Sequence, residues 1–271
     1  MRLAPALLLT LAACARAHTS RPGQVCSPPP EAATFFAHAH NDYEHPHPLE
    51  DALGFGFHSV EADVFYDYGQ FDVKHQLFDR SKGTLEALYL APLQARVKAN
   101  GTVFPDGDPF VLWLDLKDSD TRITEELQAL LLKYASMLTR IDGEAVAEGP
   151  ITVVLTGDAA AKRRYVEAPS PRFAFRDSNV FSPDDPPADA RWRYYALAWG
   201  AHLSWDGVGA PSASQQQELA CLMENAAAGG RKVRLYNSPE LPSTWEQLRA
   251  FGLDFIGTDR LEDLSNFLSA R

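Results

Sequence analysis

The chain has 271 residues, of which 45% are hydrophobic and 23% charged, with 17 glycines and 19 prolines. These are the values of a globular protein, and they exclude collagen-like, low-complexity and wholly disordered chains. The formal net charge of −11 argues against a nucleic-acid-binding protein, which needs a basic face, but not against an enzyme for phosphate esters, because a bound divalent cation can reverse the local field.

The N-terminus, residues 1–17, is predicted to be an export signal. A basic start precedes the apolar run Leu3–Leu11, which is too short to span a bilayer but suits a secretory signal. The run ends in the sequence LAAC, which resembles the lipobox of bacterial lipoproteins and would make Cys14 a lipidated membrane tether. The alternative is cleavage after Ala17 and a secreted protein. Both readings predict an exported protein, either a bacterial lipoprotein of the periplasm or cell envelope or a secreted protein.

Residues 18–33 are rich in proline and polar side chains, as expected of a tether between a membrane anchor and a domain. In an oxidising compartment Cys26 and Cys221 could form a disulfide. The alternative is that Cys221 is simply a small buried hydrophobic residue of a helix. The sequence leaves both open.

The remaining residues, 34–271, alternate short apolar runs with helical patterns and predict one domain. The predicted strands are Thr34–His40, His58–Tyr66, Phe110–Lys117, Ile151–Gly157, Phe173–Arg176, His202–Asp206, Lys232–Asn237 and Asp254–Thr258. The predicted helices are Pro48–Gly54, Thr121–Leu138, Ala159–Glu167, Arg191–Trp199, Ser212–Ala228, Ser243–Phe251 and Leu261–Ala270, and Thr84–Lys98 links the second and third strands. Eight strands alternating with helices predict an α/β fold of the (β/α)8 TIM-barrel type. A doubly wound sheet is the alternative, but no glycine-rich βα turn supports it.

Two histidines end the first predicted strand. Strand side chains alternate between faces, so His38 and His40 point to the same side, which we expect to be the barrel mouth. Such a cluster directly after an apolar run is a candidate for chemistry.

Three carboxylates are expected at the same mouth. Glu61 and Asp63 share one face of the second strand, and Asp115 ends the third. Carboxylates this close repel one another unless a cation or a proton lies between them, and oxygen-rich groups of this kind suit Mg²⁺ or Ca²⁺. Lys117 could neutralise Asp115 or contact a substrate phosphate, and His75, after a turn, is a candidate acid or base.

Four of these residues together resemble the signature of the phosphatidylinositol-phospholipase-C-like (PLC-like) phosphodiesterase superfamily: His38, Glu61, Asp63 and His75. In glycerophosphodiester phosphodiesterases a histidine ends the first strand, Glu-x-Asp ends the second, and another histidine follows an Asp-Gly turn. Sphingomyelinase D enzymes share this layout and add Asp-Leu-Lys, which residues 115–117 reproduce. The sequence most resembles the family named after the fungal "altered inheritance of mitochondria" protein 6. The matching segments are residues 40–43, 48–49, 51–53, 88–93, 204–207 and 234–239.

The resemblance implies a TIM barrel with a metal-assisted phosphodiesterase site. It implies one divalent cation, Mg²⁺ or Ca²⁺, on Glu61, Asp63 and Asp115, and acid–base catalysis by two histidines, His75 and one of the first-strand pair. The residues expected to contact substrate are Asn41, Lys117, Trp205 and Tyr236.

The sequence also departs from the pattern of the glycerophosphodiesterases. Ala39 stands where those enzymes have a phosphate-contacting arginine, and the turn at residues 67–69 reads Asp-Tyr-Gly in place of Asp-Gly. The spacing to Glu61 allows either His38 or His40 as the first catalytic histidine. We prefer His38, because Asn41 then falls where the sphingomyelinase pattern has asparagine.

The predicted function is that of a phosphoric diester hydrolase acting on a glycerophosphodiester or a phospholipid-like diester. A substrate hydroxyl as nucleophile would give a cyclic phosphate, and water a simple hydrolysis. One alternative is a metallohydrolase of the amidohydrolase or polymerase-and-histidinol-phosphatase type, with His38 and His40 as ligands, but His202 is its one available late ligand. The other is a non-catalytic, phosphoester-binding lipoprotein. We expect a monomer with a small-molecule or lipid diester as its partner and no nucleic acid.

Overall fold

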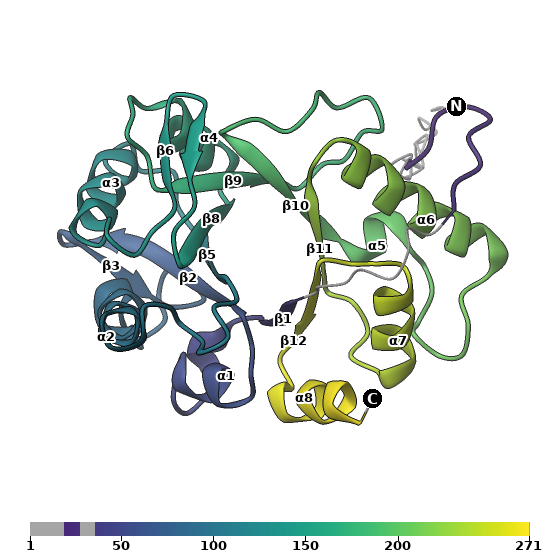
Figure 1. Cartoon of the computed structure of the whole chain (residues 1–271), viewed down its shortest axis with the longest axis horizontal. Coiled ribbons are helices and arrows are strands. Elements are labelled where there is room, and N and C mark those ends of the chain that lie inside the picture. Colours follow the sequence, from purple (N-terminus) through teal and green to yellow (C-terminus); the bar gives the residue numbers. More distant parts are fainter. Residues whose placement is uncertain (1–18, 28–35, 271) are drawn as a thin grey trace, which may run out of the picture.

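The computed structural model describes residues 19–27 and 36–270, and its centre is a closed barrel of parallel strands (Figure 1). The barrel strands are β1 (Phe36–Ala39), β2 (Ser59–Asp67), β5 (Phe110–Leu116), β8 (Ile151–Gly157), β9 (Ala174–Ser178), β10 (Trp192–Ala198), β11 (Lys232–Tyr236) and β12 (Phe255–Thr258). They follow one another around the barrel in chain order, and β1 pairs with both β2 and β12, which closes it. The predicted TIM barrel is confirmed. The predicted signal segment and Cys14 lie outside the described residues.

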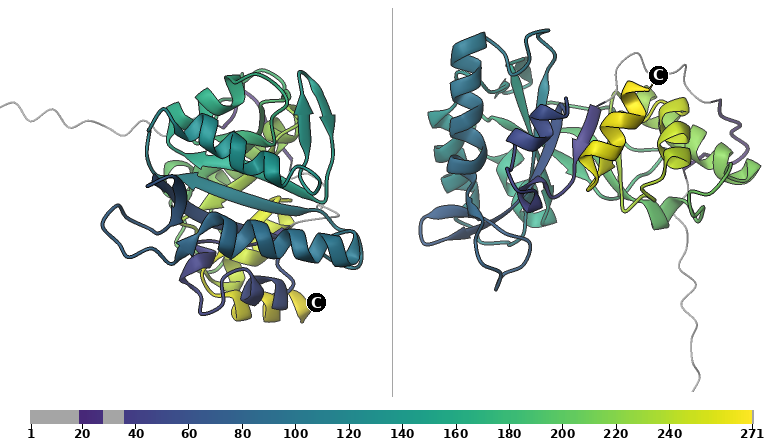
Figure 2. Two further views of the ribbon diagram at one scale, coloured as in Figure 1. Left: turned by 90° about the vertical axis from the view of Figure 1, so that its left-hand side faces the viewer. Right: turned by 90° about the horizontal axis from the view of Figure 1, so that it is seen from below.

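Helices surround the strands, as the views from the side and from below show (Figure 2). They are α1 (Glu50–Gly54), α2 (Ala91–Asn100), α3 (Ile123–Lys133), α4 (Ala159–Glu167), α5 (Trp199–His202), α6 (Ala213–Ala228), α7 (Pro242–Ala250) and α8 (Leu261–Ser269), with a 3₁₀ turn η1 (Asp42–Glu44) and a π-helical turn η2 (Glu86–Leu90). Two short hairpins complete the fold and were not predicted: β3 (Gln70–Val73) with β4 (Gly83–Thr84), and β6 (Arg140–Asp142) with β7 (Ala145–Ala147). None of the described helices has the length and apolar character needed to cross a membrane.

Aromatic side chains fill the barrel interior. Strands of a parallel barrel are buried on both faces, and alternate residues face inward. The inward residues form a core of their own that is separate from the core beneath the helices. Trp113 lies at its centre, with its ring edge-on to Phe255 at 5.4 Å and to Tyr194 at 5.6 Å. This layer lies against the functional residues, because the ring of His38 is 6.0 Å from that of Trp113.

The sixth barrel strand differs from the prediction. Residues predicted as the helix Arg191–Trp199 form β10, and the predicted strand His202–Asp206 is instead the end of α5 and a loop. The sequence WRYYALA is apolar nearly throughout, so its periodicity does not separate a strand from a buried helix. Its aromatic residues favour a strand that can pack on both faces.

The first described segment, residues 19–27, lies beside α6 (Figure 1). Cys26 forms a disulfide with Cys221 of α6, with the two Cα atoms 5.0 Å apart. The side-chain amide of Asn225 also donates to the carbonyl of Thr19 at 2.9 Å. Of the two alternatives left open for these cysteines, the structure therefore has the disulfide. This part of the predicted tether is attached to the barrel.

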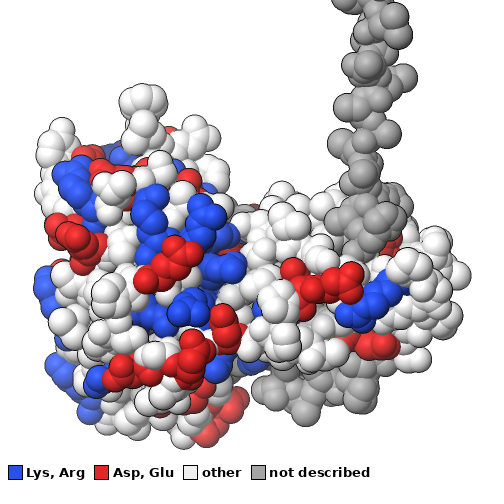
Figure 3. Space-filling view, turned by 90° about the horizontal axis from the view of Figure 1, so that it is seen from above, with Lys and Arg blue, Asp and Glu red and all other residues white. Residues whose placement is uncertain are grey.

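The surface carries both signs of charge. On the face in Figure 3, Lys and Arg side chains lie among Asp and Glu side chains. Exposed ion pairs such as Arg191–Glu144 and Arg140–Asp142 are of this kind, and each contributes little to stability. That the protein binds no nucleic acid stays a prediction.

Candidate active site at the carboxyl end of the barrel

His38, in β1, is buried and engaged through both ring nitrogens. Its Nδ1 lies 2.8 Å from the Ser59 hydroxyl, and its Nε2 accepts a hydrogen bond from Arg234 Nη1 at 2.6 Å. Burial and the neighbouring Arg234 charge lower the pKa of His38 to about 4, so that the ring is neutral at physiological pH. A ring held in this way positions Arg234. This arrangement does not favour our preference for His38, but which of His38 and His40 is catalytic stays a prediction.

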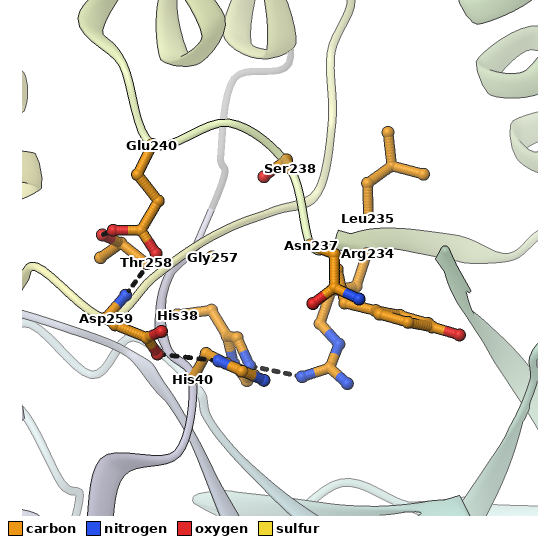
Figure 4. A pocket seen from close by; sticks show the side chains of 11 residues that line it. His38, His40, Arg234, Leu235, Asn237, Ser238, Glu240, Gly257, Thr258 and Asp259 are labelled. Carbon is orange, nitrogen blue, oxygen red and sulfur yellow. Dashed lines mark hydrogen bonds and ion pairs between the residues drawn. The ribbon is translucent and has the colours of Figure 1, made fainter. Parts of the chain in front are cut away.

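His40 lies just beyond β1, and 31% of its side chain is exposed. Its Nδ1 lies 2.8 Å from Asp259 Oδ1 in the loop after β12, and its Nε2 is 3.9 Å from Glu61 Oε2 (Figure 4). Burial lowers the pKa of His40, but the hydrogen bond to Asp259 and the charge of Glu61 outweigh it, and the net shift is upward. His40 thus combines a fixed Nδ1 with an Nε2 directed into the site.

Glu61 of β2 and Arg234 of β11 form a buried bidentate ion pair at the centre of the site. Arg234 Nη1 donates to Oε2 at 2.6 Å and Nη2 to Oε1 at 2.9 Å. Burial alone would raise the pKa of Glu61, but the charge of Arg234 holds it well below its usual value. The guanidinium lies over the Trp113 ring, 4.6 Å from its centroid. Arg234 thereby places a guanidinium in the site. The glycerophosphodiesterase pattern has an arginine at the position of Ala39, which this chain lacks.

Asp63 of β2 anchors the second exposed histidine. Its Oδ2 accepts from the Tyr43 hydroxyl at 2.8 Å and from Lys117 Nζ at 2.9 Å, and lies 3.0 Å from Nδ1 of His75. The side chain of His75 is half-exposed, and the described residues give its Nε2 no hydrogen-bond partner. His75 is therefore arranged like His40, with Nδ1 on a carboxylate and Nε2 available.

Asp115, at the end of β5, lies beside Asp63, because β2 and β5 pair in parallel with these two residues opposite each other. Lys117 Nζ bridges them, 2.6 Å from Asp115 Oδ2. Gly157 of β8 makes room for Asp115. Its φ is +81°, and a Cβ there would lie 2.0 Å from Asp115 Oδ1. A side chain at this position would displace the carboxylate.

Glu61, Asp63 and Asp115 are brought together as predicted, with one oxygen of each within 4.8 Å of the others. Asp63 Oδ1 is also buried and has no hydrogen-bond partner among the described residues, which costs free energy unless a ligand compensates it. Hard oxygen donors and an uncompensated buried carboxylate oxygen fit a cation such as Mg²⁺ or Ca²⁺. These acidic groups could therefore bind a metal.

Two cavities meet at this site. The larger, about 290 Å³, is lined by His40, Glu61, Asp115, Thr156, Gly157, Asn179, Arg234 and Tyr236. The smaller, about 60 Å³, lies between His40 and the loops after β11 and β12 (Figure 4). The larger one joins a histidine, carboxylates and a guanidinium in one volume.

A profile of the AIM6-like phosphodiesterase domain matches residues 31–177, more than half of the chain. The chain belongs to this family.

Yeast relatives of this AIM6-like domain share about a quarter of its residues. Altered inheritance of mitochondria protein 6 of Eremothecium gossypii is 26% identical over 85% of this chain and 68% of its own length. The protein of the same name from Saccharomyces cerevisiae is 26% identical over 83% and 68%, and that from Lachancea thermotolerans 25% over 84% and 64%. The chain thus spans about two thirds of these relatives. Because they are eukaryotic proteins, the predicted localisation as a bacterial lipoprotein is wrong.

Solved structures share the fold of the AIM6-like domain at low identity. A glycerophosphodiester phosphodiesterase from Parabacteroides distasonis superposes with a TM-score of 0.54 and 14% identity, over 89% of this chain and 99% of that chain. A calcium-dependent phosphoinositol-specific phospholipase C from a Pseudomonas species has a TM-score of 0.58 and 13% identity, over 86% and 91%. These likenesses confirm the TIM-barrel fold.

The AIM6-like domain brings some predicted substrate residues to the site and not others. Tyr236 lines both cavities, and Lys117 bridges the carboxylates. Asn41 has a left-handed φ of 47°, and its Oδ1 accepts from the Tyr43 hydroxyl at 3.2 Å. Trp205 is not among the residues that line these two cavities. Its ring is buried and packs on that of Trp199, and its Nε1 donates to the Val208 carbonyl, so its contact with substrate stays a prediction.

Three functional residues were assigned no role from the sequence: Arg234, Asp259 and Tyr43. Each contacts a predicted site residue, but Arg234 and Asp259 lie about two hundred positions further along the chain. Tyr43 and Arg234 do fall within the segments that resemble the family. An arginine between the apolar residues Val233 and Leu235 of the strand was the available signal for Arg234, since an isolated buried charge is costly.

Proposed function

We propose that this AIM6-like domain cleaves phosphodiesters by acid–base catalysis, with His40 and His75 as the two proton-transfer groups. The observation that carries the proposal is their matched arrangement: each has Nδ1 on a carboxylate, Asp259 or Asp63, and an Nε2 that makes no hydrogen bond with the described residues. Orientation by a carboxylate fixes the tautomer that presents Nε2 to a substrate. One histidine would take a proton from the attacking hydroxyl, and the other would protonate the leaving oxygen.

Arg234 would hold the phosphoryl group. It lines both cavities, and its Nε is buried and finds no hydrogen-bond partner in the part of the chain that the structure describes. Glu61 and His38 fix the guanidinium plane, so little side-chain entropy is lost when an anion binds. Lys117, Asn41 and Tyr236 are the further side chains that we propose for substrate contact.

Glu61, Asp63 and Asp115 would hold one divalent cation, Mg²⁺ or Ca²⁺. When bound, the cation would stabilise negative charge that develops on the phosphoryl oxygens. The cluster of carboxylate oxygens and the calcium dependence named for the Pseudomonas phospholipase support this. Arg234 and Lys117 share the same carboxylates, so the cation would act beside two fixed positive charges.

A panel of soluble glycerophosphodiesters and lysophospholipids tests this function. We expect turnover of at least one diester, loss of turnover with EDTA, and recovery when Mg²⁺ or Ca²⁺ is added. Phosphorus NMR of the product separates a cyclic phosphate from a phosphomonoester. Binding without turnover of any diester would favour the phosphoester-binding alternative and end the proposal. Turnover that survives EDTA would show that catalysis needs no divalent cation. Arg234 and Lys117 would then be the positive charges that act on the phosphoryl group.

The zinc-type metallohydrolase alternative receives no support from the histidines. His38 already uses both ring nitrogens on Ser59 and Arg234. His202 ends α5 and is buried, and its pKa is lowered by that burial. A site that needs several imidazole ligands therefore lacks them among the described residues.

Asp259→Asn is expected to move one limb of the pH profile of kcat/KM to lower pH. Asp259 raises the pKa of His40 above its ordinary 6.5, and asparagine keeps an acceptor but removes the negative charge, so this pKa falls. If His40 is the proton donor, the alkaline limb moves down; if it is the acceptor, the acid limb does. Asp51→Asn is the matched control, because Asp51 pairs with His47 on the surface. Superimposable profiles for Asp259→Asn and wild type would show that His40 does not titrate in catalysis.

A further inference from the structure

Two large apolar side chains stand at the tip of the turn that follows His75. In this turn, Gln76 to Asp79, the Asp79 N–H donates to the Gln76 carbonyl at 3.1 Å, and the Gln76 N–H donates to Asp79 Oδ2 at 2.9 Å. The central positions are Leu77, 57% exposed, and Phe78, 97% exposed. Turn centres favour Gly, Pro, Asn, Asp and Ser. Leu77 and Phe78, here called the apolar tip, therefore present apolar surface to water at a place where polar residues are usual.

The turn is attached firmly to the site. Lys74 is buried, its Nζ donates to the Leu77 carbonyl at 2.9 Å, and its ammonium lies over the Phe65 ring at 5.1 Å. His75 stands next to Lys74 and contacts Asp63. Because the segment is held on both sides of His75, the apolar tip keeps a fixed place beside the site.

We infer that the apolar tip enters the surface of a lipid bilayer. Two side chains on a convex turn are far too small for a stable protein interface, which buries roughly 1,200–2,000 Å². The same two side chains suit shallow, reversible insertion at the level of the headgroups. Arg80, which follows the turn, is exposed, and the described residues give it no ion pair. An arginine here can reach lipid phosphates while the apolar tip is buried.

Docking in this way identifies the class of substrate, and this step rests on the proposed function. His75 is two residues from Leu77, so insertion brings its Nε2 close to the headgroup layer. The diester of a membrane lipid would then be presented to the site by the bilayer. The apolar tip would raise the rate on lipid in vesicles without acting on a soluble diester.

Vesicle sedimentation tests the inference with the full chain. The comparison is between wild type, Leu77→Ser/Phe78→Ser and the matched control Leu132→Ser, whose leucine is 55% exposed on α3. With phosphatidylcholine vesicles, we expect the double variant to lose at least about tenfold in partitioning, because two apolar side chains no longer leave water. The control should bind like wild type. The wild type and the two variants have the same N-terminal residues, so any contribution of these residues to vesicle binding is the same in all three proteins.

A reporter keeps the test decisive if the double variant folds poorly. In Phe78→Trp the indole fluorescence should shift to shorter wavelength with vesicles, and brominated lipid should quench it, whereas Leu132→Trp should show neither effect. Equal vesicle binding by wild type and the double variant, or no binding by wild type, would overturn the inference.

Turnover separates this inference from the proposed function. The double variant should cleave a soluble diester at the wild-type rate and a vesicle lipid at least about tenfold more slowly. Loss of vesicle binding in a protein that cleaves no diester would leave the docking inference standing and end the proposed function. If the double variant cleaved both substrates at the wild-type rate, the proposed function would stand and the docking inference would be overturned.

Discussion

His75→Ala is expected to lower kcat on a phosphodiester by about 10²–10⁴-fold, the usual contribution of one acid–base group. Stability and cation affinity should change little, because the side chain is half-exposed and its removal leaves no buried cavity. Steady-state kinetics, thermal unfolding and bound cation measured on the same preparation check all three. His47→Ala is the matched control, since His47 also pairs with an aspartate but lies on the surface.

Substitutions of His38 and His40 should differ in their effects on turnover and stability. His40→Ala should resemble His75→Ala in kinetics. His38→Ala should lose stability, by about 1–3 kcal/mol, because it leaves buried hydrogen-bonding groups without a partner. If His38 and His40 were metal ligands, each substitution would instead strip the cation, and His75→Ala would be nearly silent. Full activity in His75→Ala would end the two-histidine mechanism.

The carboxylate cluster could be predicted because its geometry follows from strand register. Glu61, Asp63 and Asp115 all face inward at the ends of neighbouring strands, and parallel pairing places Asp63 opposite Asp115. An apolar–polar alternation along two strands is enough to deduce this. The same reasoning predicted that His38 and His40 share a side of the first strand.

The features that the sequence could not predict are how deeply a side chain is buried and which residues far apart in the chain come into contact. His38 and His40 differ by two positions, yet one is buried on Arg234 and the other is a third exposed, because β1 ends between them. Arg234 meets Glu61 across 173 positions of chain, and no local pattern states that contact. The strand β10 was mistaken for a helix because a nearly continuous apolar segment has too few polar positions to reveal a period.

Arg234→Met is expected to destabilise the fold by about 3–5 kcal/mol, because it leaves the Glu61 carboxylate buried without its partner. Both side chains are nearly fully buried, and both guanidinium contacts are short. Denaturant unfolding gives the change in free energy. Arg140→Met is the matched control: its partner Asp142 is exposed, so the loss should stay below about 1 kcal/mol.

The double variant Arg234→Met/Glu61→Leu separates the structural role of this pair from its role in catalysis. Replacing a buried ion pair by apolar residues of similar volume is often neutral or stabilising, so the double variant should recover most of the stability that Arg234→Met loses. Activity should not recover with it, because the proposed phosphate contact and one carboxylate are both gone. A stable double variant that keeps wild-type turnover would show that the pair serves only the fold, and the phosphate would then have to be held by other residues, of which Lys117 is the nearest cation to Asp63 and Asp115.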